Sequence, residues 1–143
     1  MTGPATERRL RILSLDDDPV NRTLIRAILV RADDPAIRGA VLREAATLAE
    51  ARALLSSETF DVLLLDVHLP DGLGLDLAAE LRRGPPGRPA ILALTASVLP
   101  ADQQAALDAG CDAFLAKPYP ALELVSAVRR LATARANESA SDE

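Results

Sequence analysis

The chain has 143 residues, the size of one domain, and its 49% hydrophobic and 26% charged residues are typical of a protein that folds around its own core. With 2% aromatic residues and a net charge of −5, it lacks the features of nucleic-acid and membrane binders. One cysteine excludes an intramolecular disulfide and a cysteine-based zinc site, and the apolar runs are too short to span a bilayer. No signal peptide is visible before residue 11, so we expect a cytoplasmic protein.

After a polar, flexible lead over residues 1–9, short apolar segments alternate with segments of helical spacing. The apolar segments predict strands at residues 11–15, 40–42, 61–65, 90–94 and 113–116. The segments between them predict a helix from Pro19, with Asp18 as its N-cap, and further helices over 47–55, through 77–81, over 100–109 and through 124–131. Residues 33–35 are expected to break the first helix, and residues 135–143 to form a polar, frayed tail.

The third and fourth predicted strands, residues 61–65 and 90–94, are apolar on both faces. This pattern is typical of a parallel sheet that helices cover on each side. Five strands alternating with five helices therefore predict an α/β fold: a doubly wound, flavodoxin-like, five-stranded parallel sheet with strand order 2-1-3-4-5. We expect one domain over residues 10–134.

Polar residues close four of the five predicted strands. Asp16 and Asp17 follow the first, Asp66 the third, Thr95 the fourth and Lys117 the fifth. Open α/β sheets bind ligands at this edge, and the predicted strand order brings the three aspartates into one crevice. Clustered carboxylates repel one another unless a cation is bound, and oxygen ligands favour Mg²⁺. With a lysine and a hydroxyl nearby, such a site suits phosphoryl transfer to an aspartate.

Each of these residues also has a structural interpretation when it is taken singly. The paired acids can be loop residues before a capped helix, the third acid an ordinary strand end, the threonine structural and the lysine a surface residue. Their joint position at one edge of the sheet favours the functional interpretation.

Four sequence segments extend the pattern. They are ILSLDDDP at residues 12–19, LDVHLPDGLG at 65–74, LTA at 94–96 and AGCDAFLAKP at 109–118. In this order and spacing, the chain resembles the receiver domain of bacterial two-component response regulators over about residues 10–134. The resemblance implies a single-domain switch that takes a phosphoryl group from a histidine kinase or a histidine phosphotransfer protein and then changes its protein contacts. Whether the domain acts alone or is cut from a hybrid kinase or a larger regulator stays open.

The resemblance also implies roles for the acidic residues. Asp66 would accept the phosphoryl group. Together with the surrounding residues, it would catalyse its own phosphorylation and dephosphorylation. Asp17 would bind Mg²⁺ directly, with Mn²⁺ as an alternative, and Asp16 would bind it mostly through water. The backbone carbonyl of His68 would complete the protein ligands.

The remaining implied roles concern the fourth and fifth strands. Thr95 would hydrogen-bond a phosphoryl oxygen, for which Ala96 leaves room. Lys117 would pair with Asp66 or its phosphate and form a cis peptide with Pro118. Phe114 takes the aromatic switch position, and a downstream protein is expected on the face of the fourth helix, fifth strand and fifth helix.

Other residues depart from the commonest pattern of the family. Ser14 places a hydroxyl in a strand that is usually aliphatic, and nothing in the sequence gives it a function. His68 and Ser97 occupy variable positions near the phosphate. The His68 side chain is expected either to alter the lifetime of the phosphate or to have no effect. Cys111 is expected to be a small core or loop residue rather than a nucleophile.

A phosphohydrolase of the haloacid dehalogenase type is the alternative from another class, since Asp16 to Asp18 contain an Asp-x-Asp motif. That family places its nucleophile on the first strand and an acidic pair late in the chain, the reverse of the order here. It also carries a cap insertion, for which this chain leaves little space. A flavodoxin-like cofactor binder would need a phosphate-binding loop after the first strand, and none is present.

Overall fold

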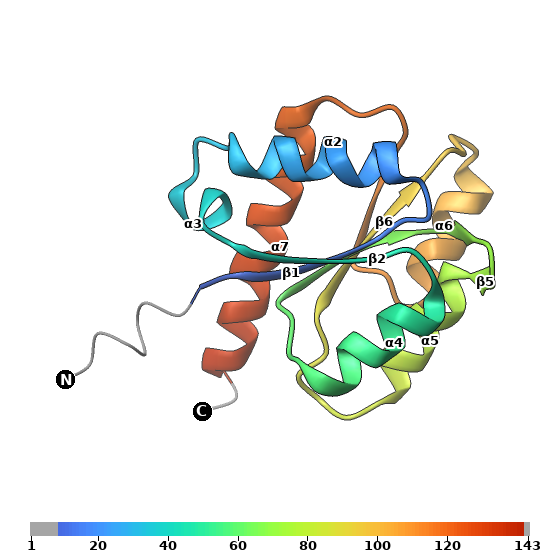
Figure 1. Ribbon diagram of the computed structural model, residues 1–143. Helices are drawn as coiled ribbons and strands as arrows, with labels where there is room; N and C mark the ends of the chain where they lie inside the picture. Colours follow the sequence, from blue (N-terminus) through green and yellow to red (C-terminus); the bar gives the residue numbers. More distant parts are fainter. Residues whose placement is uncertain (1–8, 142–143) are drawn as a thin grey trace.

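The computed structural model describes residues 9–141, so the lead predicted for residues 1–9 lies outside the described residues except for Arg9. Its centre is a five-stranded parallel sheet (Figure 1). The strands are β1 (Arg11–Leu15), β2 (Val41–Ala45), β3 (Val62–Asp66), β6 (Ala90–Thr95) and β7 (Ala113–Ala116). They lie in the order β2-β1-β3-β6-β7, which is the predicted order 2-1-3-4-5 counted along the chain.

Helices cover both faces of this sheet. They are α2 (Pro19–Val30), α3 (Pro35–Arg38), α4 (Leu48–Ser57), α5 (Gly74–Arg83), α6 (Pro100–Ala109) and α7 (Ala121–Ser141). Helices α2, α3 and α7 pack on one face and α4, α5 and α6 on the other (Figure 1). Every residue of β3 and β6 is buried, because each of these strands contacts apolar side chains on both sides. The core therefore consists of two aliphatic clusters separated by the sheet.

The described chain has six helices where the sequence predicted five. The additional helix is α3, which begins where residues 33–35 were expected only to break the preceding helix. The Asp34 carboxylate accepts a hydrogen bond from the backbone N–H of Ala36 (2.9 Å), and Pro35 occupies the first helical position. The same residues thus end one helix and start another, and Ile37 becomes part of the core.

Two further elements differ from the prediction. The segment after Asp66 forms a small antiparallel hairpin, β4 (His68–Leu69) with β5 (Gly72–Leu73), where only a turn was expected. Helix α7 continues to Ser141 through most of the predicted tail. Its polar residues have adequate helix propensity. Arg135 also anchors this part of the helix by donating to the carbonyls of Arg88 (2.9 Å) and Gly87 (2.5 Å).

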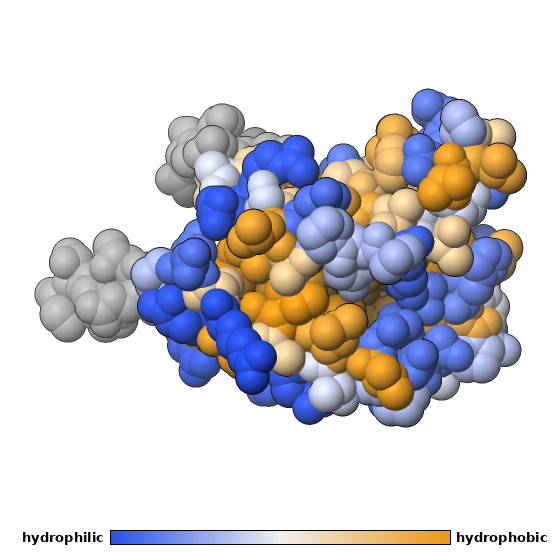
Figure 2. All heavy atoms as spheres, turned by 90° about the horizontal axis from the view of Figure 1, so that it is seen from above, coloured by the Kyte–Doolittle hydropathy of each residue, from blue (hydrophilic) through white to orange (hydrophobic). Residues whose placement is uncertain are grey.

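The surface of the molecule is mixed in character. Seen from above α2, hydrophobic side chains are exposed among hydrophilic ones (Figure 2). On α2 itself, Val20 and Leu24 are 71% and 53% exposed. Among the described helices, none is long and apolar enough to cross a lipid bilayer.

Candidate functional site

The three aspartates that the sequence placed at strand ends come together in the structure. Each of Asp16, Asp17 and Asp66 offers a carboxylate oxygen, and these oxygens all lie within 4.8 Å of one another. Asp16 and Asp66 are buried at the ends of β1 and β3, whereas Asp17 is exposed. Neighbouring parallel strands end at the same edge, which explains why residues fifty positions apart meet here.

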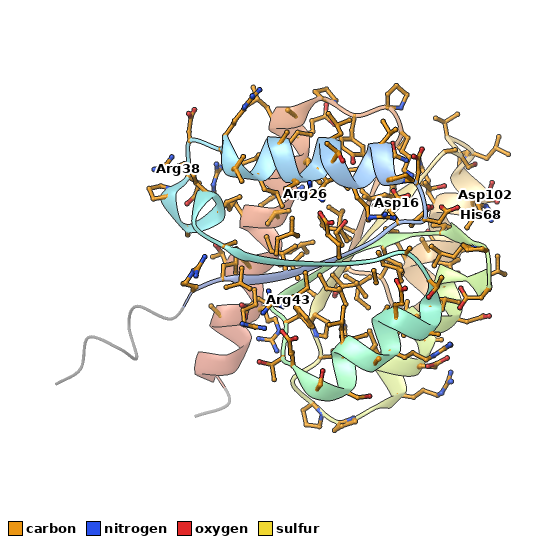
Figure 3. The ribbon with its side chains drawn as sticks, in the orientation of Figure 1. Asp16, Arg26, Arg38, Arg43, His68 and Asp102 are labelled. Carbon is orange, nitrogen blue, oxygen red and sulfur yellow. The ribbon has the colours of Figure 1, made fainter. Side chains whose placement is uncertain are left out.

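Hydrogen bonds to β2 and to the start of α2 hold Asp16 in place. Its Oδ1 accepts from the backbone N–H of Asp18 (2.9 Å), and its own N–H donates to the carbonyl of Ala45 on β2 (3.0 Å). Arg22, one turn into α2, donates from Nη1 to the Asp16 carbonyl oxygen (2.6 Å). Figure 3 shows Asp16 at the end of β1, beside the start of α2. The start of α2 is thereby fixed against the acidic cluster.

Asp66 is also buried, at the end of β3. Burial raises the pKa of its carboxyl, the charge of Lys117 opposes that rise, and the charge of Asp16 adds to it. The backbone N–H of His68 donates to Asp66 Oδ1 (3.3 Å), while the His68 side chain is exposed. Behind the aspartate, a Cβ on Gly74 would lie 2.2 Å from the Asp66 carbonyl oxygen. Only glycine fits at this first position of α5.

Lys117 supplies the cationic group of the site. Its Nζ lies 3.5 Å from Asp16 Oδ2 and 3.8 Å from Asp66 Oδ1, so it bridges both buried acids and is nearer to Asp16. The peptide bond between Lys117 and Pro118 is cis, as predicted. The Lys117 N–H donates to the Thr95 carbonyl (2.7 Å), which joins the ends of β6 and β7.

The charges of the site are not balanced by the protein alone. By formal charges alone, the three carboxyl groups count −3 and the Lys117 ammonium group +1, which leaves −2. The donors are oxygens, two of them buried, and hard divalent cations prefer such ligands. The cluster therefore fits a divalent metal ion.

Thr95 and Phe114 lie where the sequence placed them. Thr95 is buried at the end of β6, and its Oγ1 accepts a hydrogen bond from the backbone N–H of Ser97 (3.0 Å). Ala96, next in the chain, is exposed. Phe114 is half-buried on β7, opposite Ala93 of β6, and packs against the core on the α6 side of the sheet.

Sequence reasoning missed three residues near the acids. Arg22 and Gly74 contact the backbone of Asp16 and Asp66, as described above. Tyr119 is half-buried, and burial together with the charge of Asp16 raises the pKa of its phenol to about 12. Two of them could have been found from the sequence, because Gly74 lies in a segment that carries the family resemblance and Tyr119 directly follows the predicted cis proline. Arg22 had none.

Cys111 is buried, and burial raises the pKa of its thiol to about 11. The thiolate is the nucleophilic form of cysteine, so a thiol with this pKa is unreactive at neutral pH. Of the two places predicted for Cys111, core or loop, the structure shows the core.

Comparison with known proteins gives a consistent result. The model of the response regulator receiver domain matches residues 12–129. A protein of Leptolyngbya boryana, described as an uncharacterized 14.6 kDa protein, is 39% identical over 127 residues, which cover 87% of this chain and 92% of that protein. The response regulator protein PilR of Pseudomonas aeruginosa is 36% identical over 137 residues. These cover 94% of this chain but only 29% of PilR.

Solved structures agree with the sequence relatives. A CheY-like receiver domain protein from Methanospirillum hungatei superposes with a TM-score of 0.79 at 27% identity, covering 92% of this chain and 99% of that one. A response regulator from Chloroflexus aurantiacus gives a TM-score of 0.79 at 29% identity, covering 88% and 99%. The family model spans most of the chain and includes the strand ends that carry the acidic cluster. This protein therefore belongs to the family of response regulator receiver domains.

Proposed function

We propose that this receiver domain accepts a phosphoryl group on Asp66 and uses it to switch protein contacts. The observation that carries the proposal is the acidic cluster, in which Lys117 bridges the buried Asp16 and Asp66 at one sheet edge. Asp66 lies on the third strand of the sheet and the paired acids on the first. This order is the reverse of the one expected for a haloacid-dehalogenase-type phosphohydrolase.

The donor is a phosphohistidine of a histidine kinase or a histidine phosphotransfer protein. A carboxylate oxygen of Asp66 forms a bond to phosphorus while the phosphorus–nitrogen bond breaks, and the electron pair stays on the imidazole, which takes up a proton. Lys117 stabilises the negative charge of the transferring group, and the Thr95 hydroxyl donates to one of its oxygens. Ala96 has no side chain beyond Cβ and leaves room for that oxygen. The domain thereby promotes its own phosphorylation, and hydrolysis of the acyl phosphate by water restores Asp66.

Asp16, Asp17 and Asp66, with the backbone carbonyl of His68, would hold Mg²⁺, and Mn²⁺ suits the same oxygen ligands. When bound, the ion neutralises charge on the phosphoryl oxygens. The protein's own contribution is to keep the ligands together, through the hydrogen bonds to Asp16 and the packing of Gly74 against Asp66.

Exposed apolar side chains beside the site suit contact with the phosphodonor protein. Leu24 of α2 and Leu122 of α7, which is 77% exposed, line one groove of 390 Å³ between the two helices. Val20 lies one turn before Leu24, close to the acids at the start of α2. We assign this groove to the donor.

The downstream protein binds a different face, made by α6, β7 and α7. Phe114 of β7 lies half-buried on this face, and a rearrangement of Thr95 on the neighbouring strand changes the space around its ring. Since Phe114 carries no hydroxyl, the ring in the phosphorylated and unphosphorylated states differs in its packing and not in a hydrogen bond. Amide spectra with and without the phosphoryl mimic beryllofluoride test this: shifts are expected at residues 96–109 and at Phe114. Shifts confined to the loops at Asp17 and Asp66 would contradict it.

Incubation with Mg²⁺ and acetyl phosphate, followed by intact-protein mass spectrometry, tests the acceptor itself. The wild type is expected to gain one phosphoryl group per chain, and Asp66→Asn none. Asp76→Asn, at an exposed acid on the first turn of α5, is the matched control and should label like the wild type. Full labelling of Asp66→Asn would overturn the assignment, and release of many equivalents of phosphate per chain would indicate a phosphatase.

A further inference from the structure

The loop that joins β6 to α6, residues 96–99, is closed by three hydrogen bonds in series. The Ser97 N–H donates to Thr95 Oγ1 (3.0 Å), and the Leu99 N–H donates to Ser97 Oγ (3.1 Å). Ser97 Oγ in turn donates to Asp102 Oδ2 (2.6 Å), on the first turn of α6. A continuous polar chain therefore leads from Thr95, at the edge of the acidic site, to Asp102.

Packing contributes little to the shape of this loop. Val98 and Leu99 are its large side chains, and they are 70% and 61% exposed, while Ala96 is exposed as well. The N-cap residue of α6 is Leu99, which makes no side-chain capping bond. The conformation of the loop thus depends on the polar chain, in which Ser97 and Asp102 tie the loop to the first turn of α6.

The hydrogen bonds also fix what the Thr95 hydroxyl can do. A hydroxyl has one hydrogen to donate and two lone pairs that accept. The Ser97 N–H occupies an acceptor position on Thr95 Oγ1, so the hydrogen of Thr95 stays available for another oxygen. Ser97 uses its own hydrogen on the Asp102 carboxylate, and charge-assisted bonds of this kind are short and strong.

We infer that Asp102 is a positioning residue which, through Ser97, orients the Thr95 hydroxyl toward the phosphoryl group on Asp66. The inference rests on the proposed function, because it assigns Thr95 its donor role. In the absence of Asp102, Ser97 loses its carboxylate partner. The exposed loop can then move, and the hydrogen bond from the Ser97 N–H to Thr95 Oγ1 breaks for part of the time. The hydroxyl then points toward the phosphoryl oxygen for only part of the time.

The test measures the rate of phosphorylation by acetyl phosphate at saturating Mg²⁺ over a range of donor concentrations. Asp102→Ala and Ser97→Ala are each expected to lower the maximal rate about tenfold, equivalent to about 1.4 kcal/mol of transition-state stabilisation. The donor concentration at half-maximal rate should stay unchanged. The double variant should lose no more than either single one, since the two residues act as a unit. Ser97→Thr keeps a hydroxyl and should restore most of the rate.

Asp108→Ala is the matched control, since Asp108 is an exposed acid on the same helix whose carboxylate accepts from Gln104 within that helix. It should phosphorylate at the wild-type rate. If Asp102→Ala lowers the melting temperature but not the maximal rate, Asp102 only stabilises the start of α6 and the inference is wrong. Additive losses in the double variant would also overturn it. Failure of the proposed function gives a different result, an unlabelled wild type or a labelled Asp66→Asn.

Discussion

Ser14 stands out among the residues of the core because its hydroxyl is buried without a hydrogen-bond partner in the described structure. It lies in the middle of β1, between Leu13 and Leu15, and pairs in register with Leu64 of β3. A buried polar group without a partner costs about 1–3 kcal/mol. No contact to the acidic site accounts for it, so its effect belongs to stability.

We expect Ser14→Ala to raise the free energy of unfolding by about 1 kcal/mol, because it removes the desolvated hydroxyl and leaves little empty volume. Urea unfolding monitored by circular dichroism measures this, with an unchanged dependence on denaturant as a check. Ser56→Ala, at an exposed serine on α4, serves as the control and should have little effect. A less stable Ser14→Ala protein would show that the hydroxyl has a favourable role.

At the scale of elements, Asp71 ties the segment after the phosphoacceptor to a neighbouring helix. Its carboxylate accepts from the backbone N–H groups of Leu48 (2.9 Å) and Ala49 (3.1 Å), the first residues of α4. These hydrogen bonds hold the pKa of the Asp71 carboxyl below its usual range, and the one from Leu48 has the larger effect. An acid whose pKa is lower in the folded state stabilises the fold above its unfolded pKa, and this contribution is lost as the pH falls through the folded pKa.

Asp71→Asn is therefore expected to destabilise the protein at pH 7. The difference from the wild type should shrink as the pH falls below about 4, because the carboxyl takes up its proton there in the unfolded chain and only at lower pH in the folded protein. Urea unfolding at several pH values measures the two curves. Asp108→Asn provides the comparison for removal of an exposed acid. A difference that stays constant with pH would show that charge plays no part in this contact.

The sequence predicted the elements wherever one physical pattern dominated. The apolar strands β3 and β6 and the acids at strand ends could be located because parallel strands end together. Helix α3 was missed although Asp34 and Pro35 repeat the helix-start signal of Asp18 and Pro19, because a helix of four residues is too short to show helical periodicity. The end of α7 could not be predicted, because it depends on the contacts of Arg135 with a distant loop. Arg22 reaches Asp16 from another element, and such a contact leaves no local trace in the sequence.

For the whole molecule, the unbalanced charge of the site links metal binding to stability. An ion that binds only the folded state stabilises it by mass action, by about 2.7 kcal/mol at a concentration one hundred times its dissociation constant. We expect Mg²⁺ to raise the melting temperature of the wild type, and Asp17→Asn to lose most of this effect. In metal-free buffer, Asp66→Asn should melt above the wild type, since the cost of burying the Asp66 charge, together with its repulsion by Asp16, outweighs its attraction to Lys117.

Thermal melts in the presence of a chelator or of millimolar Mg²⁺ measure these differences. Asp76→Asn should respond to Mg²⁺ like the wild type, because Asp76 lies outside the acidic cluster. A wild-type melting temperature that does not change with Mg²⁺ would count against a divalent ion at this site.

The fit of Gly74 against Asp66 has a consequence for how the site tolerates mutation. Charged groups of the cluster can be replaced by neutral ones of the same shape without disturbing the packing around them. Position 74 allows no such exchange, because even a methyl group would lie 2.2 Å from the Asp66 carbonyl oxygen. Any larger residue must push the start of α5 away from the end of β3, and with it the hairpin between them. Random mutagenesis should therefore yield folded but inactive proteins at the aspartates, and misfolded ones at this glycine.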